Sequence, residues 1–251
     1  MGSEFQGPRT AIVTGGAKRI GAEIVRALAA DGWHVVIHYN RSIAEAEALA
    51  AEVGNARTVQ AELADPSAAA SIVGAAEGLP PLRLLVNNAS RFVFDDVGGF
   101  TVESWDAHLD INLRAPALLA QAFAAASDGG LIVNLLDAKL AQPNPDFFSY
   151  TVSKFGLAGM TELLARALAP RIRVNAIAPA VTLVSGPQSL ANYAKVHALN
   201  ALERGVEVGQ IVEALRYIVS APTLTGQTIT LDAGQRFLSL PRDVQFLEPE
   251  E

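Results

Sequence analysis

Tyr150 and Lys154 are spaced for joint proton chemistry, and Asp137 lies thirteen residues before the tyrosine. On a helix, residues four apart share one face, so the lysine ammonium would lie near the phenol. A free phenol has a pKa of about 10, and a nearby positive charge favours its ionised form. Such a tyrosine can exchange a proton with an oxygen or nitrogen of a substrate. Alone the spacing is weak, because a half-buried tyrosine beside a solvated lysine is common in helices.

A glycine-rich turn near the start of the chain predicts a dinucleotide site. Residues 9–14 have the composition of a short buried strand, residues 14–21 read TGGAKRIG, and residues 22–30 form an amphipathic helical pattern that ends before Gly32. Glycines let the backbone approach a pyrophosphate, and the helix N-terminus offers amide hydrogens and a positive dipole end. An ordinary strand–helix turn is the plainer alternative.

The end of the next predicted strand, at residues 34–39, indicates which cofactor binds. A site for NADH usually has an acidic residue there, whereas this chain has Asn40, Arg41 and Ser42. A guanidinium suits the 2′-phosphate of NADPH, and Arg19 in the glycine turn could reach the same place. We therefore predict NADPH, against the alternative that these arginines are only solvated surface residues.

Further motifs follow in a characteristic order along the chain. They are NNA at 87–89 after a strand at 82–86, Asn112, the Tyr150–Lys154 pair, RVNAIAP at 173–179 and LTGQTITLDAG at 224–234. In this order the chain resembles the short-chain dehydrogenase/reductase family over roughly residues 9–236. The resemblance implies an α/β fold with a doubly wound parallel sheet of about seven strands. It also implies a catalytic Asn112–Tyr150–Lys154 group, a homotetramer and a cytoplasmic location.

Two departures from the general family pattern point to its pteridine reductase branch. Asp137 stands where the family usually has serine, and Ser90 and Phe92 follow the NNA motif. The segments GGAKRIG at 15–21, HYNRS at 38–42, and NLLDA at 134–138 are similar to that branch as well. By this resemblance Asp137 and Tyr150 are the proton-donating pair, Lys154 holds the nicotinamide ribose, and Phe92 stacks on the pterin.

The resemblance also implies the remaining binding residues. Those expected at the cofactor are Gly15, Arg19, Ile20, Gly21, Asn40, Arg41, Ser42, Glu62, Leu63, Asn88, Ala89, Ser90, Lys154 and Pro179. Those expected at the substrate are Arg19, Ser90, Phe92, Asp137, Tyr150 and Leu183. The four histidines have no metal-ligand spacing and there is no cysteine, so no metal is expected.

Residue chemistry agrees with a flat, nitrogen-rich substrate. Phe92 offers a π face that could align a pterin ring opposite the nicotinamide. A carboxyl group beside a tyrosine in an enclosed cleft can carry a proton near neutrality, which a serine cannot do. The plainer alternatives are that Asp137 caps a turn, that Phe92 packs in a loop, and that Asn112 marks a helix kink before Pro116.

The composition limits the number of domains and the kinds of partner that the protein can have. A chain of 251 residues that is 50% hydrophobic can bury one substantial core, and nothing divides residues 9–251 into more than one domain. We take residues 1–8 as the remnant of an expression tag. The net charge of −7 argues against a nucleic acid or an anionic membrane as partner.

Two segments have no clear pattern. Residues 182–204, with Leu183, Leu190, Tyr193 and His197, are expected to cover the substrate and set specificity. The tail beyond Phe237 is more apolar than a free terminus should be, and we expect it to pack on a neighbouring subunit.

The sequence thus predicts an NADPH-dependent pteridine reductase for dihydropterin or dihydrofolate-type rings, with oxidised pterins as a further candidate substrate. A carbonyl reductase, such as a 3-oxoacyl-thioester reductase, is the close alternative on the same scaffold. A non-catalytic NADP-sensing regulator is a more remote one, against which the complete Asn112, Tyr150 and Lys154 set argues.

Overall fold

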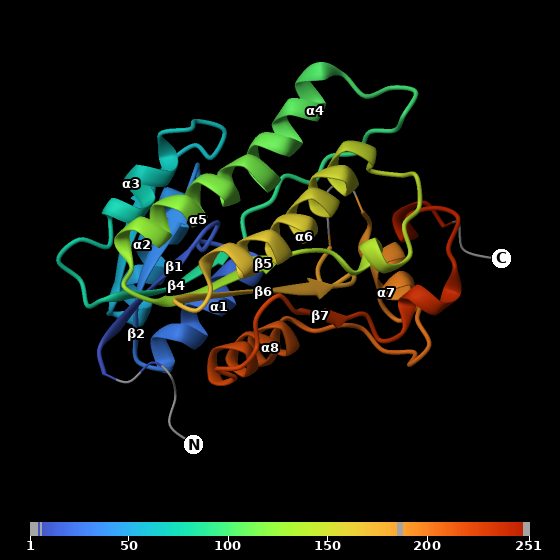
Figure 1. Cartoon of the computed structure of the whole chain (residues 1–251). Helices are drawn as coiled ribbons and strands as arrows, with labels where there is room; N and C mark the ends of the chain where they lie inside the picture. The colour runs from blue at the N-terminus through green and yellow to red at the C-terminus, as the bar shows by residue number, and fades with distance from the viewer. Residues whose placement is uncertain (1–4, 6, 185–187, 248–251) are drawn as a thin grey trace.

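The computed structural model describes residues 5, 7–184 and 188–247 of the chain. A parallel sheet of seven strands forms its centre, in the order β3-β2-β1-β4-β5-β6-β7 (Figure 1). Its strands are β1 Arg9–Val13, β2 Trp33–Tyr39, β3 Ala56–Gln60, β4 Leu82–Asn87, β5 Gly130–Leu135, β6 Ile172–Pro179 and β7 Thr228–Leu231. The doubly wound α/β fold predicted from the sequence is confirmed.

Helices cover both faces of the sheet. They are α1 Arg19–Ala30, α2 Ile43–Val53, α3 Ala68–Gly74, α4 Val102–Leu109, α5 Ala115–Ala126, α6 Phe148–Leu168, α7 Leu190–His197 and α8 Val208–Ser220. Helices α1, α2 and α8 pack on one face, and α3, α5 and α6 pack on the other. Short helical turns η2 Ala138–Ala141, η3 Gln235–Leu238 and η4 Val244–Phe246 border the carboxyl edge of the sheet.

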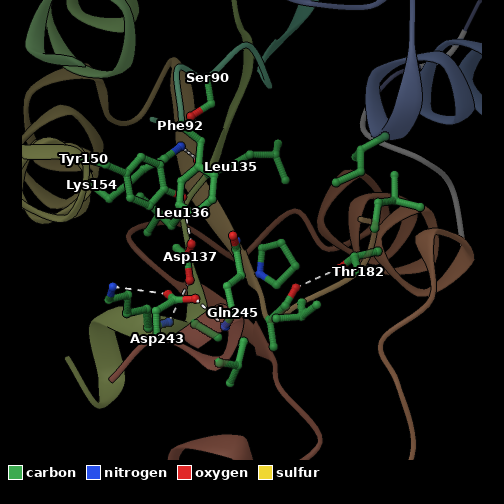
Figure 2. A pocket seen from close by; sticks show the side chains of 18 of the residues that line it. Ser90, Phe92, Leu135, Leu136, Asp137, Tyr150, Lys154, Thr182, Asp243 and Gln245 are labelled. Atoms are coloured by element: carbon green, nitrogen blue, oxygen red, sulfur yellow. Dashed lines mark hydrogen bonds and ion pairs between the residues drawn. The ribbon is translucent and has the colours of Figure 1, made fainter. Parts of the chain in front are cut away.

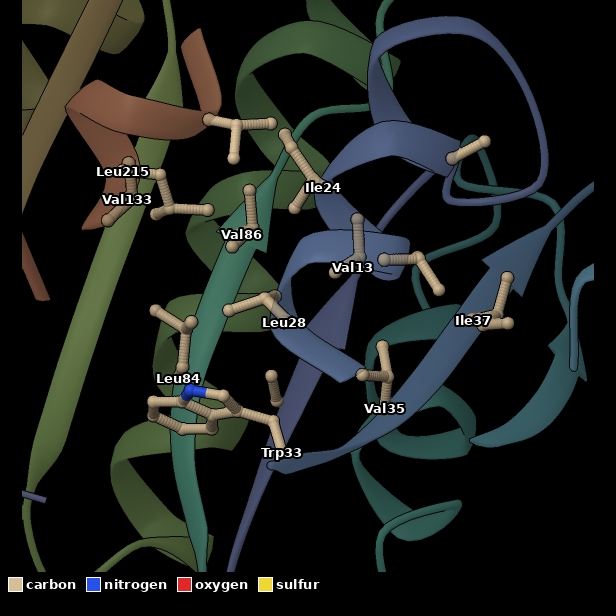
Figure 3. Close-up of a cluster of buried hydrophobic side chains, with 14 of the residues drawn as sticks. Val13, Ile24, Leu28, Trp33, Val35, Ile37, Leu84, Val86, Val133 and Leu215 are labelled. Carbon is tan, nitrogen blue, oxygen red and sulfur yellow. The ribbon is translucent and has the colours of Figure 1, made fainter. Parts of the chain in front are cut away.

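The alternation of side chains along each strand divides the core into two layers. In β1, Ala11 and Val13 face α1 while Ile12 faces the opposite layer. Figure 3 shows the first layer, in which Val13 and Trp33 lie among the side chains of α1. Since both faces are covered, the central strands contain apolar runs such as Ala11–Val13 in β1 and Leu84–Val86 in β4, as buried parallel strands do.

One helix of the second layer is interrupted where the sequence placed Asn112. Between α4 and α5 lies a single π-helical turn, η1 Asp110–Arg114. Pro116 has no N–H to donate to the carbonyl four residues earlier, that of Asn112, so an ordinary α-helical turn cannot close there. Asn112 does mark an irregularity in the helix, and it also makes the contacts described below.

The structure adds two observations to the expectations about the chain ends. Phe5 is buried and its ring lies edge-on to Trp33 with centroids 5.7 Å apart, so this residue of the 1–8 segment belongs to the core. Val244 and Phe246 pack on the substrate end of this same chain, whereas Phe237 is 67% exposed. The tail is therefore only partly left for a neighbour, and the homotetramer remains a prediction.

Among the described residues, none of the helices combines the length and the apolar character that crossing a bilayer requires.

Candidate active site

A cleft of about 480 Å³ opens at the carboxyl edge of the sheet. Because all seven strands are parallel, the segments that follow β1, β4, β5 and β6 meet at this edge. The cleft is lined by predicted residues from each of them: Gly15, Arg19, Ile20, Gly21, Asn88, Ala89, Ser90, Phe92, Asp137, Tyr150, Lys154, Pro179 and Leu183. Most of the predicted site is thus brought together.

The predicted proton pair is formed. The Tyr150 hydroxyl, in the first turn of α6, donates a hydrogen bond over 2.7 Å to Oδ2 of Asp137, the N-cap residue of η2 (Figure 2). Tyr150 is only 6% exposed, and burial, followed by the Asp137 charge, raises the pKa of its phenol well above the usual value. The phenol therefore keeps its proton across neutral pH and is an acid rather than a base.

Lys154 lies on the same face of α6 but does not act on the phenol as the spacing predicted. Its Nζ donates to the carbonyl oxygen of Leu135 over 2.7 Å and lies 5.7 Å from the centroid of the Tyr150 ring. Burial lowers the pKa of Lys154 to about 8, an effect that Asp137 partly opposes. The expectation that Lys154 lowers the pKa of Tyr150 is wrong for this arrangement, because burial and a carboxylate outweigh a lysine that is itself poorly solvated.

Phe92 lies against Tyr150 within a cluster of aromatic rings. Its ring stacks on Phe147 with centroids 4.1 Å apart and meets Tyr150 edge-on at 4.7 Å. Phe94 and Phe246 complete the cluster around Phe147. Since Phe92 also lines the cleft and is partly exposed, its ring is held in place beside the proton pair.

The glycine turn is built by close backbone approach. A Cβ atom on Gly21 would lie 2.2 Å from the carbonyl oxygen of Gly15, a distance that no side chain tolerates. Gly15 has a φ of +59°, which favours glycine, and its N–H donates to His38 Nδ1 over 3.2 Å. Asn88 Nδ2 donates to the carbonyl oxygens of Thr14 and Gly15. The turn is therefore fixed from β2 and β4 as well as by its own sequence.

A second hollow adjoins the first and contains the residues expected at the adenosine end of a cofactor. Asn40, Arg41, Ser42 and Glu62 line it, together with Lys18, which the sequence analysis missed. Asn40 Nδ2 donates to Glu62 Oε2 over 2.6 Å, and Lys18 forms an ion pair of 2.6 Å with Glu45. Within the described part of the chain, the exposed Arg41 side chain forms no hydrogen bond or ion pair.

Arg19 does not join Arg41, contrary to one of its predicted roles. With a φ of +54°, it points along the main cleft, where Nη2 donates to the carbonyl oxygen of Val184 over 2.8 Å. Arg19 lines the cleft, and its other predicted role, between cofactor and substrate, remains a prediction.

Two predicted site residues, Asn112 and Leu63, line neither the cleft nor the second hollow. Asn112 is 1% exposed; its Oδ1 accepts from the N–H of Arg91 over 2.8 Å, and its Nδ2 donates to Ser153 Oγ over 3.0 Å. These side-chain bonds hold the loop after β4 against α6, and the catalytic role of Asn112 remains a prediction. Leu63 is buried in the core beneath α3, where its apolar side chain belongs.

The C-terminal segment supplies lining residues that the sequence analysis did not identify. Asp243, Val244 and Gln245 line the cleft on the side of Asp137. Asp243 Oδ2 lies 3.4 Å from Lys139 Nζ, and burial raises the pKa of its carboxyl group. Arg242 and the Asp243 N–H both bind the Asp146 carboxylate, which fastens the segment to the loop after β5. The apolar residues of the tail were the only signal of this packing.

The predicted specificity segment is only partly at the cleft. Thr182, Leu183 and Gln188 line it, whereas Leu190 is 76% exposed. Tyr193 donates its hydroxyl hydrogen bond to the carbonyl oxygen of Thr182 over 2.8 Å, so α7 holds this wall rather than forming it. Residues 185–187 lie outside the described residues. In the described part of the chain, no group of three or more histidine, cysteine or acidic residues could hold a metal ion.

The sequence model of the family described as short chain dehydrogenase matches residues 9–192. The chain belongs to the short-chain dehydrogenase family. It is accordingly an oxidoreductase, and the predicted family and enzyme class are both confirmed.

One relative known by its sequence and two solved structures show what the chain is similar to. The granaticin polyketide synthase putative ketoacyl reductase 2 of Streptomyces violaceoruber is 31% identical, covering 91% of this chain and 96% of its own. A solved structure of FolM alternative dihydrofolate reductase 1 from Brucella canis, complexed with NADP, is 42% identical with a TM-score of 0.87, covering 91% of this chain and 94% of its own. A blue fluorescent protein from a metagenomic library, in complex with NADPH, is 34% identical with a TM-score of 0.84, covering 90% and 97%.

Proposed function

We propose that this protein is an NADPH-dependent pteridine reductase acting on dihydropterin or dihydrofolate-type rings. The observation that carries the proposal is the 2.7 Å hydrogen bond between Tyr150 and Asp137, formed beside the ring of Phe92 in one cleft. The 42% identity to a FolM alternative dihydrofolate reductase supports the same substrate class.

The residues present fit NADPH. Gly15 and Gly21 leave the backbone of the turn bare, as close approach of a pyrophosphate needs. Arg41, which has no charge partner among the described residues, would bind the 2′-phosphate, and Ser42 lies beside it. Lys154 would hold the nicotinamide ribose. The bound cofactor supplies a hydride to a ring carbon of the substrate.

The protein's own residues then supply and hold the proton. In the reduction of a C=N bond, the carbon gains the hydride and the adjacent nitrogen gains a proton, and NADPH becomes NADP⁺. Tyr150, protonated at neutral pH, can give that proton. Asp137 is half-buried and reaches solvent, so it can return a proton from water to the phenol. Phe92 would hold the ring flat against the nicotinamide.

Carbonyl reduction is the second candidate, because a relative that is 31% identical is named as a ketoacyl reductase. Tyr150 and Lys154 would serve that reaction equally well. Asp137 and Phe92 argue against it, since a carbonyl oxygen needs neither a carboxyl group behind the tyrosine nor a flat aromatic surface. The formed Tyr150–Asp137 pair also argues against a regulator without activity.

Oxidation of NADPH with a panel of dihydropterins, dihydrofolate and keto compounds tests the proposal. The wild type should reduce pterins, and Asp137→Ser should lower that activity most strongly at high pH. Asp106→Ser, which changes an exposed aspartate on α4, is the matched control. Phe92→Leu should raise the pterin KM several-fold, since stacking contributes about 1 kcal/mol beyond burial. Keto turnover without pterin turnover, or a faster keto reaction in Asp137→Ser, would reject the pteridine proposal.

A further inference from the structure

Helix α6, which carries Tyr150 and Lys154, does not cap its own N-terminus. The residue at its N-cap is Phe147, in the left-handed region with a φ of 53° and a ψ of 54°, and a phenyl ring accepts no hydrogen bond from the first turn. The first N–H groups of a helix have no partners within the helix, so acceptors must come from elsewhere.

Asp95 provides those acceptors from a loop 54 residues earlier in the chain. Its carbonyl oxygen accepts from the N–H of Phe148 over 3.1 Å, and its Oδ1 accepts from the N–H of Ser149 over 2.9 Å. Its Oδ2 accepts a short hydrogen bond from the Ser149 hydroxyl. Asp95 is 7% exposed and Ser149 is fully buried, so this cap is shielded from water.

Helix α4 supplies two further residues, Ser104 and His108, that contact this cap. Ser104 donates its hydroxyl hydrogen bond to Asp95 Oδ2 over 3.2 Å. His108 Nδ1 lies 2.9 Å from the carbonyl oxygen of Ser104 and 2.6 Å from Ser149 Oγ, and its Nε2 accepts from the N–H of Val93 over 3.2 Å. These partners assign the proton to Nδ1, and burial lowers the pKa of His108, so the ring is neutral.

The hydrogen-bonded cluster of Asp95, Ser104, His108 and Ser149 connects the two segments that carry Tyr150 and Phe92. Ser149 precedes Tyr150 on α6, and Val93 follows Phe92 in the loop. The rings of Phe92 and Tyr150 meet at 4.7 Å. Any movement of the loop relative to the start of α6 would therefore change the position of the proton donor relative to the stacking ring.

We propose that Asp95 is a positioning residue. From the loop that carries Phe92 it caps helix α6, which carries Tyr150, and so holds the side chains of Tyr150 and Phe92 in a fixed relative position. The inference rests on the roles proposed above for these two residues. Asp95 itself does not line the cleft, and within the described part of the chain the hydrogen bonds to its carboxylate come from Ser149 and Ser104. Its effect on turnover must therefore pass through the helix and the loop.

The test compares Asp95→Asn with Asp96→Asn, an adjacent change at an exposed aspartate of the same loop. The asparagine at 95 keeps the shape but loses the charge and one acceptor. We expect kcat to fall roughly 10- to 100-fold, as small misplacements of reacting groups do, while the Kd for NADPH stays within about twofold. The pterin KM should rise, and the limb of the pH–rate profile set by the Tyr150 phenol should shift. Asp96→Asn should behave as the wild type.

A double variant separates positioning from general stability. In a Tyr150→Phe background, Asp95→Asn should lower the remaining rate by less than about threefold, because both changes act on one proton transfer. A full multiplication of the two effects would overturn the proposal. So would an unchanged kcat, or equal losses in kcat and in NADPH affinity.

Two provisions keep the test decisive. If Asp95→Asn does not fold, Ser149→Ala keeps both backbone N–H bonds to Asp95 and removes only the hydroxyl contacts with Asp95 Oδ2 and His108 Nδ1. It should lower kcat in the same direction by a smaller factor, and an unchanged kcat would contradict the proposal. If pterins prove not to be substrates, the same comparison on a keto substrate still tests the effect on Tyr150, since that residue would donate the proton in either reaction. Failure of the proposed function is thereby distinguished from failure of this inference.

Discussion

The two ends of the cleft are built in different ways. At the cofactor end, the turn from Gly15 to Gly21 and the strand end at Arg41 lie within one β-α-β unit of the chain. At the substrate end, Phe92, Asp137, Tyr150 and Asp243 come from four separate segments. The cofactor end is formed by glycine backbone without side chains and by one exposed charge. The substrate end is formed by side chains that contact one another in the cleft.

This difference implies that the two ends can be damaged separately. A change at the cofactor end should alter NADPH affinity and leave the chemical step alone, because its groups would contact the pyrophosphate and the 2′-phosphate, away from the reacting atoms. A change at the substrate end should alter turnover and leave cofactor affinity alone. Lys154 lies between the two and should link them.

The largest effect is expected at the substrate end, from Tyr150→Phe. Loss of the hydroxyl removes the proton donor but little contact area, so kcat should fall roughly 10²–10⁴-fold. The Kd for NADPH, measured by fluorescence titration, should remain nearly that of the wild type. Tyr217→Phe, at a 58% exposed tyrosine on α8, is the control. Near-native turnover in Tyr150→Phe would mean that another group donates the proton.

An intermediate effect is expected at the cofactor end, from Arg41→Ala. Losing a charged hydrogen-bond partner of the 2′-phosphate should weaken NADPH binding by about 1.5–3 kcal/mol, which is roughly 10- to 150-fold in Kd. NADH binding should barely change, and Arg166→Ala, at an exposed arginine of α6, should affect neither. Equal losses for NADPH and NADH would show that Arg41 does not read the phosphate.

The smallest effect is expected at Lys154, as a dependence on pH. Because burial lowers the pKa of Lys154 to about 8, its ammonium is charged below that pH and neutral above it. If the charged form holds the ribose, NADPH affinity should be constant below about pH 8 and fall above it, by at most about tenfold per pH unit. In Lys154→Met, NADPH affinity should not fall above pH 8. A wild-type affinity that rises or stays level between pH 7.5 and 9.5 would contradict the assignment.

Much of the fold could be predicted because its signals are local. Strand-like and helical segments alternate along the chain, and this pattern alone specifies a parallel sheet with helices on both faces. The glycine turn was equally evident, because the backbone geometry of the turn requires glycine. At Gly21 any Cβ would collide with the carbonyl oxygen of Gly15. The pairing of Asp137 with Tyr150 followed from the family resemblance, and the structure forms it.

Other parts of the site depend on segments that only the folded chain brings together. The sequence placed Arg19 beside Arg41, but the positive φ of Arg19 turns it toward Val184. It assigned the tail to a neighbouring subunit, whereas the Asp146 carboxylate draws Arg242 and Asp243 to this chain's own cleft.

The sequence by itself determined the order of elements, the glycine turn and the identity of the residues that could move a proton. Tertiary structure alone decided how those residues ionise and where they are held. Lys154 was expected to lower the pKa of Tyr150, yet burial raises the pKa of the phenol and lowers that of the lysine. The physical reason is that backbone sterics and hydrophobic alternation act between near neighbours in the chain, whereas desolvation depends on every segment that covers a group.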